Sequence, residues 1–124
     1  MKILVADDDP IMRRIIELRL KKDGHEVIMA IDGRQAMEHL DKNEKFDLVV
    51  TDLMMPFSSG MEIVSKIKSN IERKTPVIVL SAMGQENIVL EAFNLGADDY
   101  ITKPFSPNEL SMRVKRLAVT AYMT

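Results

Sequence analysis

Short apolar runs alternate along this chain with longer segments whose apolar residues recur every three or four positions. A run of four or five apolar residues suits a β-strand, whereas a spacing of three or four suits an amphipathic α-helix. Strands that alternate with helices form βαβ units, in which parallel strands are covered by helices. Because crossovers between such strands are right-handed, the alternation predicts a doubly wound α/β domain with three layers.

Five strand-like runs can be placed on the sequence. Near-continuous apolarity in the first, third and fourth predicts burial on both faces of a parallel sheet. The first helix is expected to begin at Pro10 behind an Asp9 N-cap and to stop at Gly24, with Ile11, Ile15 and Leu18 at helical spacing. The expected strands are residues 2–6, 26–30, 47–50, 76–80 and 100–102, and the other helices cover about 33–44, 60–72, 86–95 and 106–119.

The length and charge of the chain limit its function. The 124 residues suffice for one ordinary core, so a single domain over residues 1–124 is expected. A net charge of −2 offers no electrostatic surface for direct nucleic acid binding or for an anionic membrane. The chain has no cysteine, and its first apolar run of four residues is too short for a signal peptide or a membrane span. We expect a cytoplasmic protein.

Charged and polar residues follow several of the expected strands. Asp7 and Asp8 follow the first strand, Asp52 the third, Ser81 the fourth and Lys103 the fifth. In a doubly wound sheet, ligands bind beyond the carboxyl ends of the strands. These side chains are therefore expected to converge on one edge of the sheet.

Converging carboxylates repel one another unless a cation or protons neutralise them. Oxygen ligands without nearby cysteine or histidine suit Mg²⁺, which binds one or two carboxylates together with phosphate oxygens. An isolated aspartate such as Asp52 can act as a nucleophile toward a phosphoryl group, and Lys103 could stabilise the charge of that group. The sequence thus predicts a magnesium-dependent phosphoryl-transfer site.

Over its whole length the chain resembles the receiver domain of two-component response regulators. The motifs that carry the resemblance are the acidic pair Asp7 and Asp8, "DLMMPFSSG" at 52–60, "SA" at 81–82 and "YITKPF" at 100–105. The resemblance implies a flavodoxin-like, five-stranded parallel sheet of strand order 2-1-3-4-5 in a three-layer sandwich; a member of this family is a standard example of that order.

The resemblance also implies roles for individual residues. Asp52 would be the phosphoacceptor and Asp8 a direct Mg²⁺ ligand, with Asp7 acting largely through water and the backbone carbonyl of Met54 as a further ligand. Lys103 would pair with the acceptor and then with the phosphoryl group, and its peptide bond to the following proline would be cis. Such a domain is a signalling phosphoacceptor rather than an enzyme, although it assists its own phosphorylation and dephosphorylation.

A switch and a set of partners follow from the same resemblance. Ser81 would move toward the phosphoryl group, and Tyr100 would turn inward into the space it leaves. The surface formed by the helix at 86–95, the strand at 100–102 and the helix at 106–119 would then change shape for a downstream effector. The apolar residues Ile88, Val89, Leu90, Phe93 and Leu95 fit either the core or such a surface. The phosphoryl donor would be a sensor histidine kinase or a phosphotransfer protein.

Two other functions are possible for this sequence. A phosphohydrolase with an aspartyl-phosphate intermediate would need a second aspartate at position 54, where this chain has Met54. A receiver that is never phosphorylated and serves only for docking would have no need of the complete set of site residues. Asp98 and Asp99 are expected to be solvated loop acids, although Asp99, with Arg113, could also contribute to a weak phosphorylation-dependent homodimer.

Overall fold

The described part of the chain forms five strands and five helices that alternate without exception. The computed structural model describes the backbone of residues 1–42, 44–70 and 74–123, with side chains as far as residue 118. The strands are β1 (Lys2–Ala6), β2 (Glu26–Ala30), β3 (Leu48–Asp52), β4 (Val77–Ser81) and β5 (Asp99–Thr102), and the helices are α1 (Pro10–Lys22), α2 (Gly33–Asp41), α3 (Gly60–Lys68), α4 (Glu86–Asn94) and α5 (Pro107–Met123).

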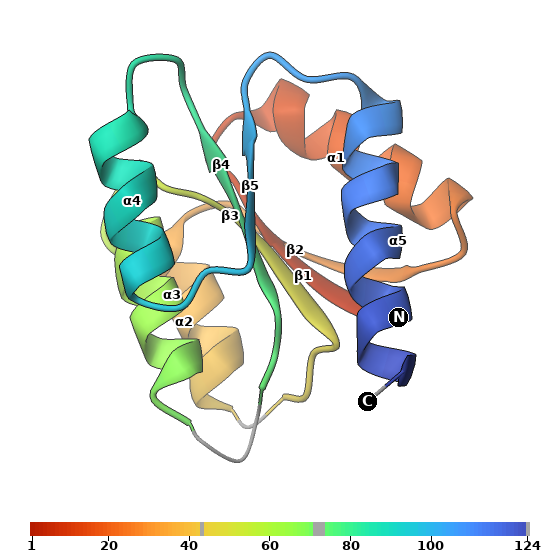
Figure 1. The fold of residues 1–124 in the computed structure, drawn as a ribbon, viewed down its shortest axis with the longest axis horizontal. Coiled ribbons are helices and arrows are strands. Elements are labelled where there is room, and N and C mark those ends of the chain that lie inside the picture. The colour runs from red at the N-terminus through yellow and green to blue at the C-terminus, as the bar shows by residue number, and fades with distance from the viewer. Residues whose placement is uncertain (43, 71–73, 124) are drawn as a thin grey trace.

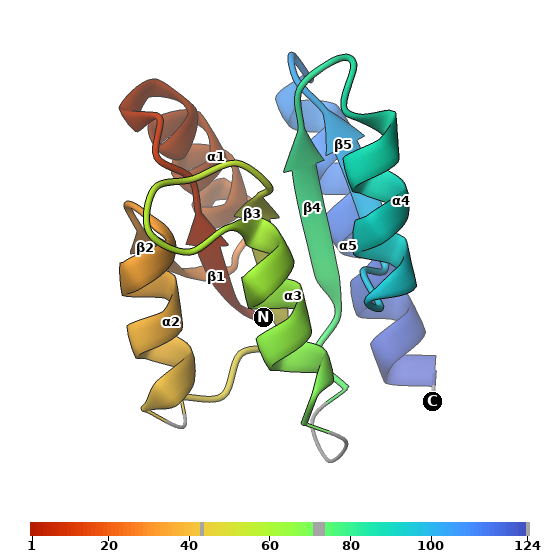
Figure 2. The same ribbon diagram turned by 90° about the vertical axis from the view of Figure 1, so that its left-hand side faces the viewer.

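The strands form one parallel sheet in the order β2-β1-β3-β4-β5. Helices α1 and α5 cover one face, and α2, α3 and α4 cover the other, which gives three layers (Figure 1). The predicted fold class and strand order are therefore confirmed. All five strands point the same way, so their carboxyl ends meet at one edge, which is the upper edge in Figure 2.

The core lies on both faces of the sheet, as the continuous apolar strands predict. Side chains of a strand alternate between faces, so Leu4 and Ala6 of β1 pack beneath α2–α4, whereas Ile3 and Val5 pack beneath α1 and α5. All four are fully buried. Strands β3 and β4 are also buried at every position, which fixes the central strands that carry the polar residues at the carboxyl edge.

The element boundaries differ modestly from the sequence prediction. Strands β3 and β4 each extend to a polar residue, Asp52 and Ser81, because sheet pairing continues that far. Helix α2 ends at Asp41 and α3 at Lys68, so both are shorter than expected; positions 43, 71 and 72 of the predicted helices lie outside the described residues. Helix α5 instead continues past 119 to Met123.

Helix α1 is present, but the spacing that predicts it comes from residues on its exposed side. Ile11 and Leu18 have 73% and 55% of their surface exposed, and Ile15 is also exposed, whereas Ile16 and Leu20 are fully buried. Periodicity establishes a helix without deciding which of two apolar faces meets the sheet. The start of α1 agrees with the prediction, because the Asp9 side chain accepts a hydrogen bond from the N–H of Ile11 at 2.9 Å.

The expectation that Asp99 is a solvated loop acid is wrong. Asp99 is the first residue of β5 and is 5% exposed. Its carboxylate accepts hydrogen bonds from Arg113 at 2.9 Å and Arg116 at 3.1 Å, both on α5. The Asp98 carboxylate accepts a bond from Lys68 at 2.9 Å and another from the N–H of Val77 at 2.8 Å. Both acids therefore connect elements of the fold.

Among the residues that the structure describes, no helix combines the length and the apolarity that crossing a membrane requires.

Candidate functional site

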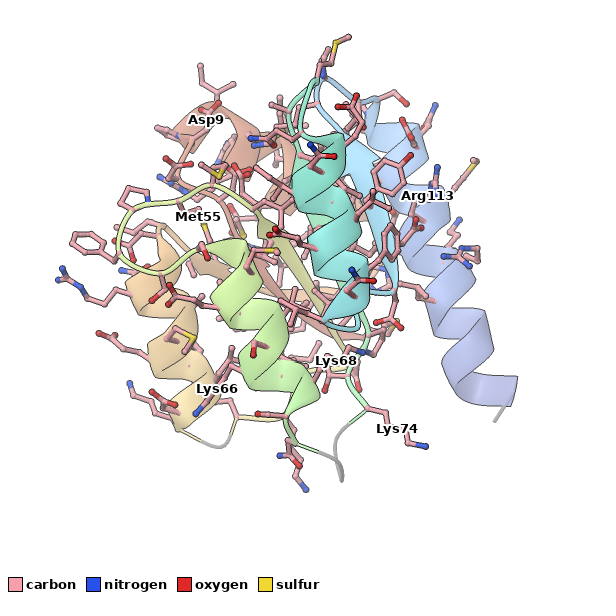
Figure 3. All side chains as sticks on the ribbon, turned by 60° about the vertical axis from the view of Figure 1, so that its left-hand side comes forward. Asp9, Met55, Lys66, Lys68, Lys74 and Arg113 are labelled. Atoms are coloured by element: carbon pink, nitrogen blue, oxygen red, sulfur yellow. The ribbon has the colours of Figure 1, made fainter. Side chains whose placement is uncertain are left out.

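The residues predicted to meet at the carboxyl edge of the sheet do meet there. Asp7 and Asp8 directly follow β1, Asp52 and Ser81 are the last residues of β3 and β4, and Lys103 follows β5. Figure 3 shows Asp9, at the start of α1, and Met55, on the loop after β3, toward this end of the molecule, whereas Lys66 and Lys74 lie toward the other end. The parallel topology brings together groups that are far apart in sequence.

Lys103 joins two of the carboxylates. Its ammonium nitrogen donates hydrogen bonds to Oδ2 of Asp7 and to Oδ2 of Asp52, each at 2.8 Å. The peptide bond that follows Lys103 is cis, as predicted. The N–H of Lys103 donates to the carbonyl of Ser81 at 2.7 Å, so β4 positions the backbone from which the ammonium reaches the acids.

Burial and pairing set the charges of this group. Burial of Asp7, which is fully inaccessible to solvent, raises the pKa of its carboxyl above the ordinary value of 3.8, although bonds from Lys103 and the N–H of Asp9 oppose the rise. Burial also disfavours the charge on Lys103, but hydrogen bonds to Asp52 and Asp7 outweigh this effect and raise the pKa of Lys103 above 10.5. One ammonium therefore compensates two closely placed carboxylates.

Asp7, Asp8 and Asp52 could together hold a cation. Each offers a carboxylate oxygen within 4.8 Å of the others. Asp7 is buried, whereas Asp8 is exposed, so the cluster opens to solvent on the side of Asp8. Three hard oxygen ligands with an open side suit Mg²⁺, which retains several waters. The residues present therefore fit the predicted metal.

The acceptor candidate Asp52 is held by its own loop as well as by Lys103. The N–H of Met54 donates to Oδ1 of Asp52 at 3.2 Å, while Oδ2 receives the bond from Lys103. Gly60, at the start of α3, packs so close that an added β-carbon would lie 2.3 Å from the carbonyl oxygen of Asp52. The glycine that ends the "DLMMPFSSG" motif is thus required by the close approach of α3 to β3.

The two switch candidates border an apolar groove between α4 and β5. Ser81 is buried at the end of β4, whereas Tyr100 of β5 is exposed and packs edge-on against Phe93 at a ring-centroid distance of 5.8 Å. A groove of about 410 Å³ lies between them, lined also by Met83, Val89 and Leu90. Of the apolar residues of α4, Val89 is buried, whereas Leu90 and Phe93 are exposed, so the helix contributes to both the core and the surface.

Sequence reasoning missed several contacts at the site. It did not pair Lys103 with Asp7, which lies 96 positions away. It also missed Arg13, whose guanidinium donates to the carbonyl of Asp7 at 2.9 Å and so holds the end of β1 from the first turns of α1. The position of Arg13, four residues after the capping Asp9, gave no distinctive signal, because α1 carries several other basic residues.

A doubly wound sheet of order 2-1-3-4-5 defines a flavodoxin-like α/β protein, and the carboxylates at its carboxyl edge could hold a cation. The family model of the response regulator receiver domain matches residues 3–115. The chain therefore belongs to the response regulator receiver domains, which act in two-component signalling.

Individual relatives agree with this assignment. The transcriptional regulatory protein SrrA of Staphylococcus aureus is 38% identical over 116 residues, which are 94% of this chain and 47% of SrrA. This chain thus spans about half the length of that relative. The crystal structure of a receiver domain protein from Clostridium thermocellum superposes with a TM-score of 0.89 at 31% identity, covering 98% of this chain and 97% of that one. The receiver domain of the Francisella response regulator 1452 gives 0.87 at 35% identity, covering 97% and 98%.

Proposed function

We propose that this chain is a magnesium-dependent phosphoryl acceptor that takes a phosphoryl group from a phosphohistidine onto Asp52. The observation that carries the proposal is the ammonium of Lys103, which lies 2.8 Å from both Asp7 and Asp52 beside the exposed Asp8. Belonging to the receiver family supports the same assignment. The donor would be a sensor histidine kinase or a phosphotransfer protein.

In the proposed transfer, a carboxylate oxygen of Asp52 attacks the phosphorus. The bond from phosphorus to the imidazole nitrogen breaks, and its electron pair returns to the histidine of the donor. Lys103 already neutralises charge at Asp52 and would turn its hydrogen bond toward the phosphoryl oxygens. The N–H of Met54 orients the acceptor through Oδ1.

The Mg²⁺ would be held by Asp8, by Asp52 and by the backbone carbonyl of Met54. Asp7 would contribute largely through water. When bound, the ion supplies positive charge that stabilises the phosphoryl oxygens during transfer. Asp9 is left out of this set because its carboxylate caps α1. The same residues would support the loss of the phosphoryl group to water, so the domain would assist both reactions without turning over a separate substrate.

The proposed switch uses Ser81 and Tyr100. A phosphoryl group on Asp52 brings charge and strong acceptor oxygens, which a hydroxyl can approach. Movement of Ser81 toward it would free space for Tyr100 to leave Phe93 and enter the groove between α4 and β5. The surface of α4, β5 and α5 would then present a different set of apolar residues to an effector.

We further propose that residues 1–124 constitute one receiver domain and that the signal passes to an effector in the cytoplasm. SrrA is named a transcriptional regulatory protein, and this chain corresponds to about half of it. Transcriptional control by a separate effector domain or protein is therefore the favoured output. The net charge of −2 gives no overall electrostatic attraction to nucleic acid, so we propose that this domain does not bind nucleic acid directly.

One experiment separates this proposal from the two alternatives. The protein is incubated with acetyl phosphate and Mg²⁺, and its intact mass and the phosphate released are followed together. A phosphoacceptor gives a single adduct with slow release, a phosphohydrolase gives steady release in large excess over protein, and a docking module gives neither. Steady turnover or the absence of any adduct would overturn the proposal.

A further inference from the structure

Helix α2 supplies none of the predicted site residues, yet it contacts the loop that links Asp52 to α3. Figure 2 shows this loop, residues 53–59, leaving β3 and arching over the start of α2 before it enters α3. The loop carries Met54, whose N–H bonds the acceptor candidate and whose carbonyl is the proposed Mg²⁺ ligand. Contacts that hold this loop in place therefore affect where the backbone of Met54 lies at the site.

The first contact is between Gly33, the first residue of α2, and the backbone of Ser58. A β-carbon added at Gly33 would lie 1.8 Å from the carbonyl oxygen of Ser58 and 2.7 Å from its nitrogen. These are main-chain atoms, so no change of rotamer could relieve the overlap. Only glycine lets the loop lie on the start of α2 at this distance.

The second contact is between Arg34 and Phe57. The guanidinium carbon of Arg34 lies 3.9 Å from the centroid of the phenyl ring, within the range of a cation–π interaction. Phe57 has φ of 73°, a left-handed conformation that is uncommon for a bulky residue and persists where surrounding contacts hold it. Phe57 is 67% exposed, so the α2 contact accounts for its position better than burial does.

The loop is closed at its base as well. The N–H of Gly60 donates to the carbonyl of Leu53 at 3.0 Å, and that of Ser58 donates to the carbonyl of Pro56 at 3.0 Å. Leu53 and Met55 pack on the core beneath α2–α4, and on the outer part of the loop Ser58 and Phe57 contact α2. Loss of either contact with α2 would move the short segment that includes Met54.

We propose that Gly33 and Arg34 are positioning residues, which hold the 53–59 loop so that the backbone of Met54 faces the carboxylate cluster. The inference rests on the proposed function for the part that concerns Mg²⁺. Neither residue touches the reacting atoms, and both act through the loop. Outer contacts of this kind typically change metal affinity by about 10- to 100-fold when they are removed.

The test measures Mg²⁺ binding calorimetrically on the unphosphorylated protein, together with the amide NMR shifts of residues 53–59 in the absence of Mg²⁺. For Gly33→Ala we expect shifted loop amides and Mg²⁺ affinity weakened about tenfold or more, although alanine is intrinsically the better helix residue. Arg34→Ala should weaken binding less, and Arg34→Lys, which keeps the cation, should restore part of the loss. Lys22→Ala, at the far end of α1, removes a charge without touching the loop and should leave both readouts unchanged.

The exposed contact provides a variant that does not endanger folding, since Phe57→Ala removes a surface ring. Phe57→Ala should shift the loop amides and abolish the difference between arginine and alanine at position 34. Parent-like Mg²⁺ affinity in Gly33→Ala, whether or not its melting temperature falls, would overturn the inference and leave the contact merely structural. If the parent itself binds no Mg²⁺, the proposed function fails, and the loop amides alone decide whether α2 positions the loop.

Discussion

The ammonium nitrogen of Lys103 lies 2.8 Å from Oδ2 of Asp52, although the two residues are 51 positions apart in the chain. The same nitrogen also bonds Asp7, which is fully buried. One ammonium thus pairs with both carboxylates.

Lys103→Met should lower the free energy of unfolding at pH 7 by about 3 kcal/mol in the absence of Mg²⁺, because it leaves a buried carboxylate unpaired. Lys103 lowers the pKa of Asp7, so the variant raises the already elevated pKa further. The Asp7 carboxylate then binds a proton more readily in the folded variant than in the unfolded chain. The free energy of unfolding of the variant therefore falls as pH rises through the pKa of Asp7 in the folded state. The deficit relative to the parent should therefore be largest near pH 7 and shrink as pH falls toward 3.8.

Chemical denaturation of the parent and the variant at several pH values measures this effect. Lys74→Met, at the opposite end of the molecule (Figure 3), is the matched control and should show little change at any pH. A deficit that is constant from pH 7 to pH 4 would show that the ammonium does not act through the ionisation of Asp7.

Asp8 is the exposed member of the carboxylate cluster and the proposed direct ligand of Mg²⁺. Because an ion that binds only the folded protein stabilises it by linkage, Mg²⁺ at 100 times its Kd should add about 2.7 kcal/mol to the parent. Asp8→Ala should lose most of this gain. Asp9→Ala should lose about 1 kcal/mol of stability with its helix cap but keep the gain from Mg²⁺. Thermal melting with and without Mg²⁺ measures the gain in stability of each variant. Equal gains in Asp8→Ala and Asp9→Ala would exclude Asp8 as a principal ligand of Mg²⁺.

The lifetime of the phosphoryl group should depend on Met54 and Met83. These residues lie two positions after Asp52 and Ser81, beside the site, and are 57% and 78% exposed. A thioether is a weak hydrogen-bond acceptor and cannot orient an attacking water as an amide or a carboxylate can. The double variant Met54→Asn, Met83→Glu should therefore lose its phosphoryl group about tenfold faster.

Release of phosphate from the purified phosphorylated proteins, at fixed Mg²⁺ concentration, measures the two rates. Leu90→Asn, another exposed apolar position on α4, serves as a control for general changes of the surface. An unchanged rate in the double variant would mean that water orientation at these positions does not set the lifetime.

The contacts of Asp99 within its own chain disfavour self-association of the domain. Its carboxylate is buried and already accepts bonds from Arg113 and Arg116 within the same chain. Pairing Asp99 with a second copy would require these bonds to break, so phosphorylated receiver domain should remain largely monomeric at micromolar concentration. Sedimentation velocity with and without acetyl phosphate checks this expectation, and a tight phosphorylation-dependent dimer would contradict it.

The order of the elements could be predicted because each strand and helix has its own local pattern. Runs such as residues 3–6 and 76–80 are apolar throughout, and caps such as Asp9 are recognisable from one or two neighbours. The convergence of the site also follows from local information, since parallel strands bring their carboxyl ends together. The individual roles came from the family resemblance and remain proposals.

What could not be predicted depends on contacts between distant elements. Ile15 and Ile16 are adjacent in sequence, and only the packing of α1 on the sheet decides that Ile16 is buried. Asp99 looked like a solvated acid because its arginine partners lie 14 and 17 positions away on α5. The support of the 53–59 loop by Gly33 likewise has no local signal, since a glycine at the start of a helix is common.

The identity of the phosphoacceptor is tested most directly by trapping it. Borohydride reduces an aspartyl phosphate to homoserine, so the protein is treated with acetyl phosphate and Mg²⁺, reduced, digested and sequenced by mass spectrometry. We expect homoserine at position 52 and at no other aspartate, with none formed in Asp52→Asn. Homoserine at position 7 or 8 while position 52 remains aspartate, or a reduced product that persists in Asp52→Asn, would contradict it.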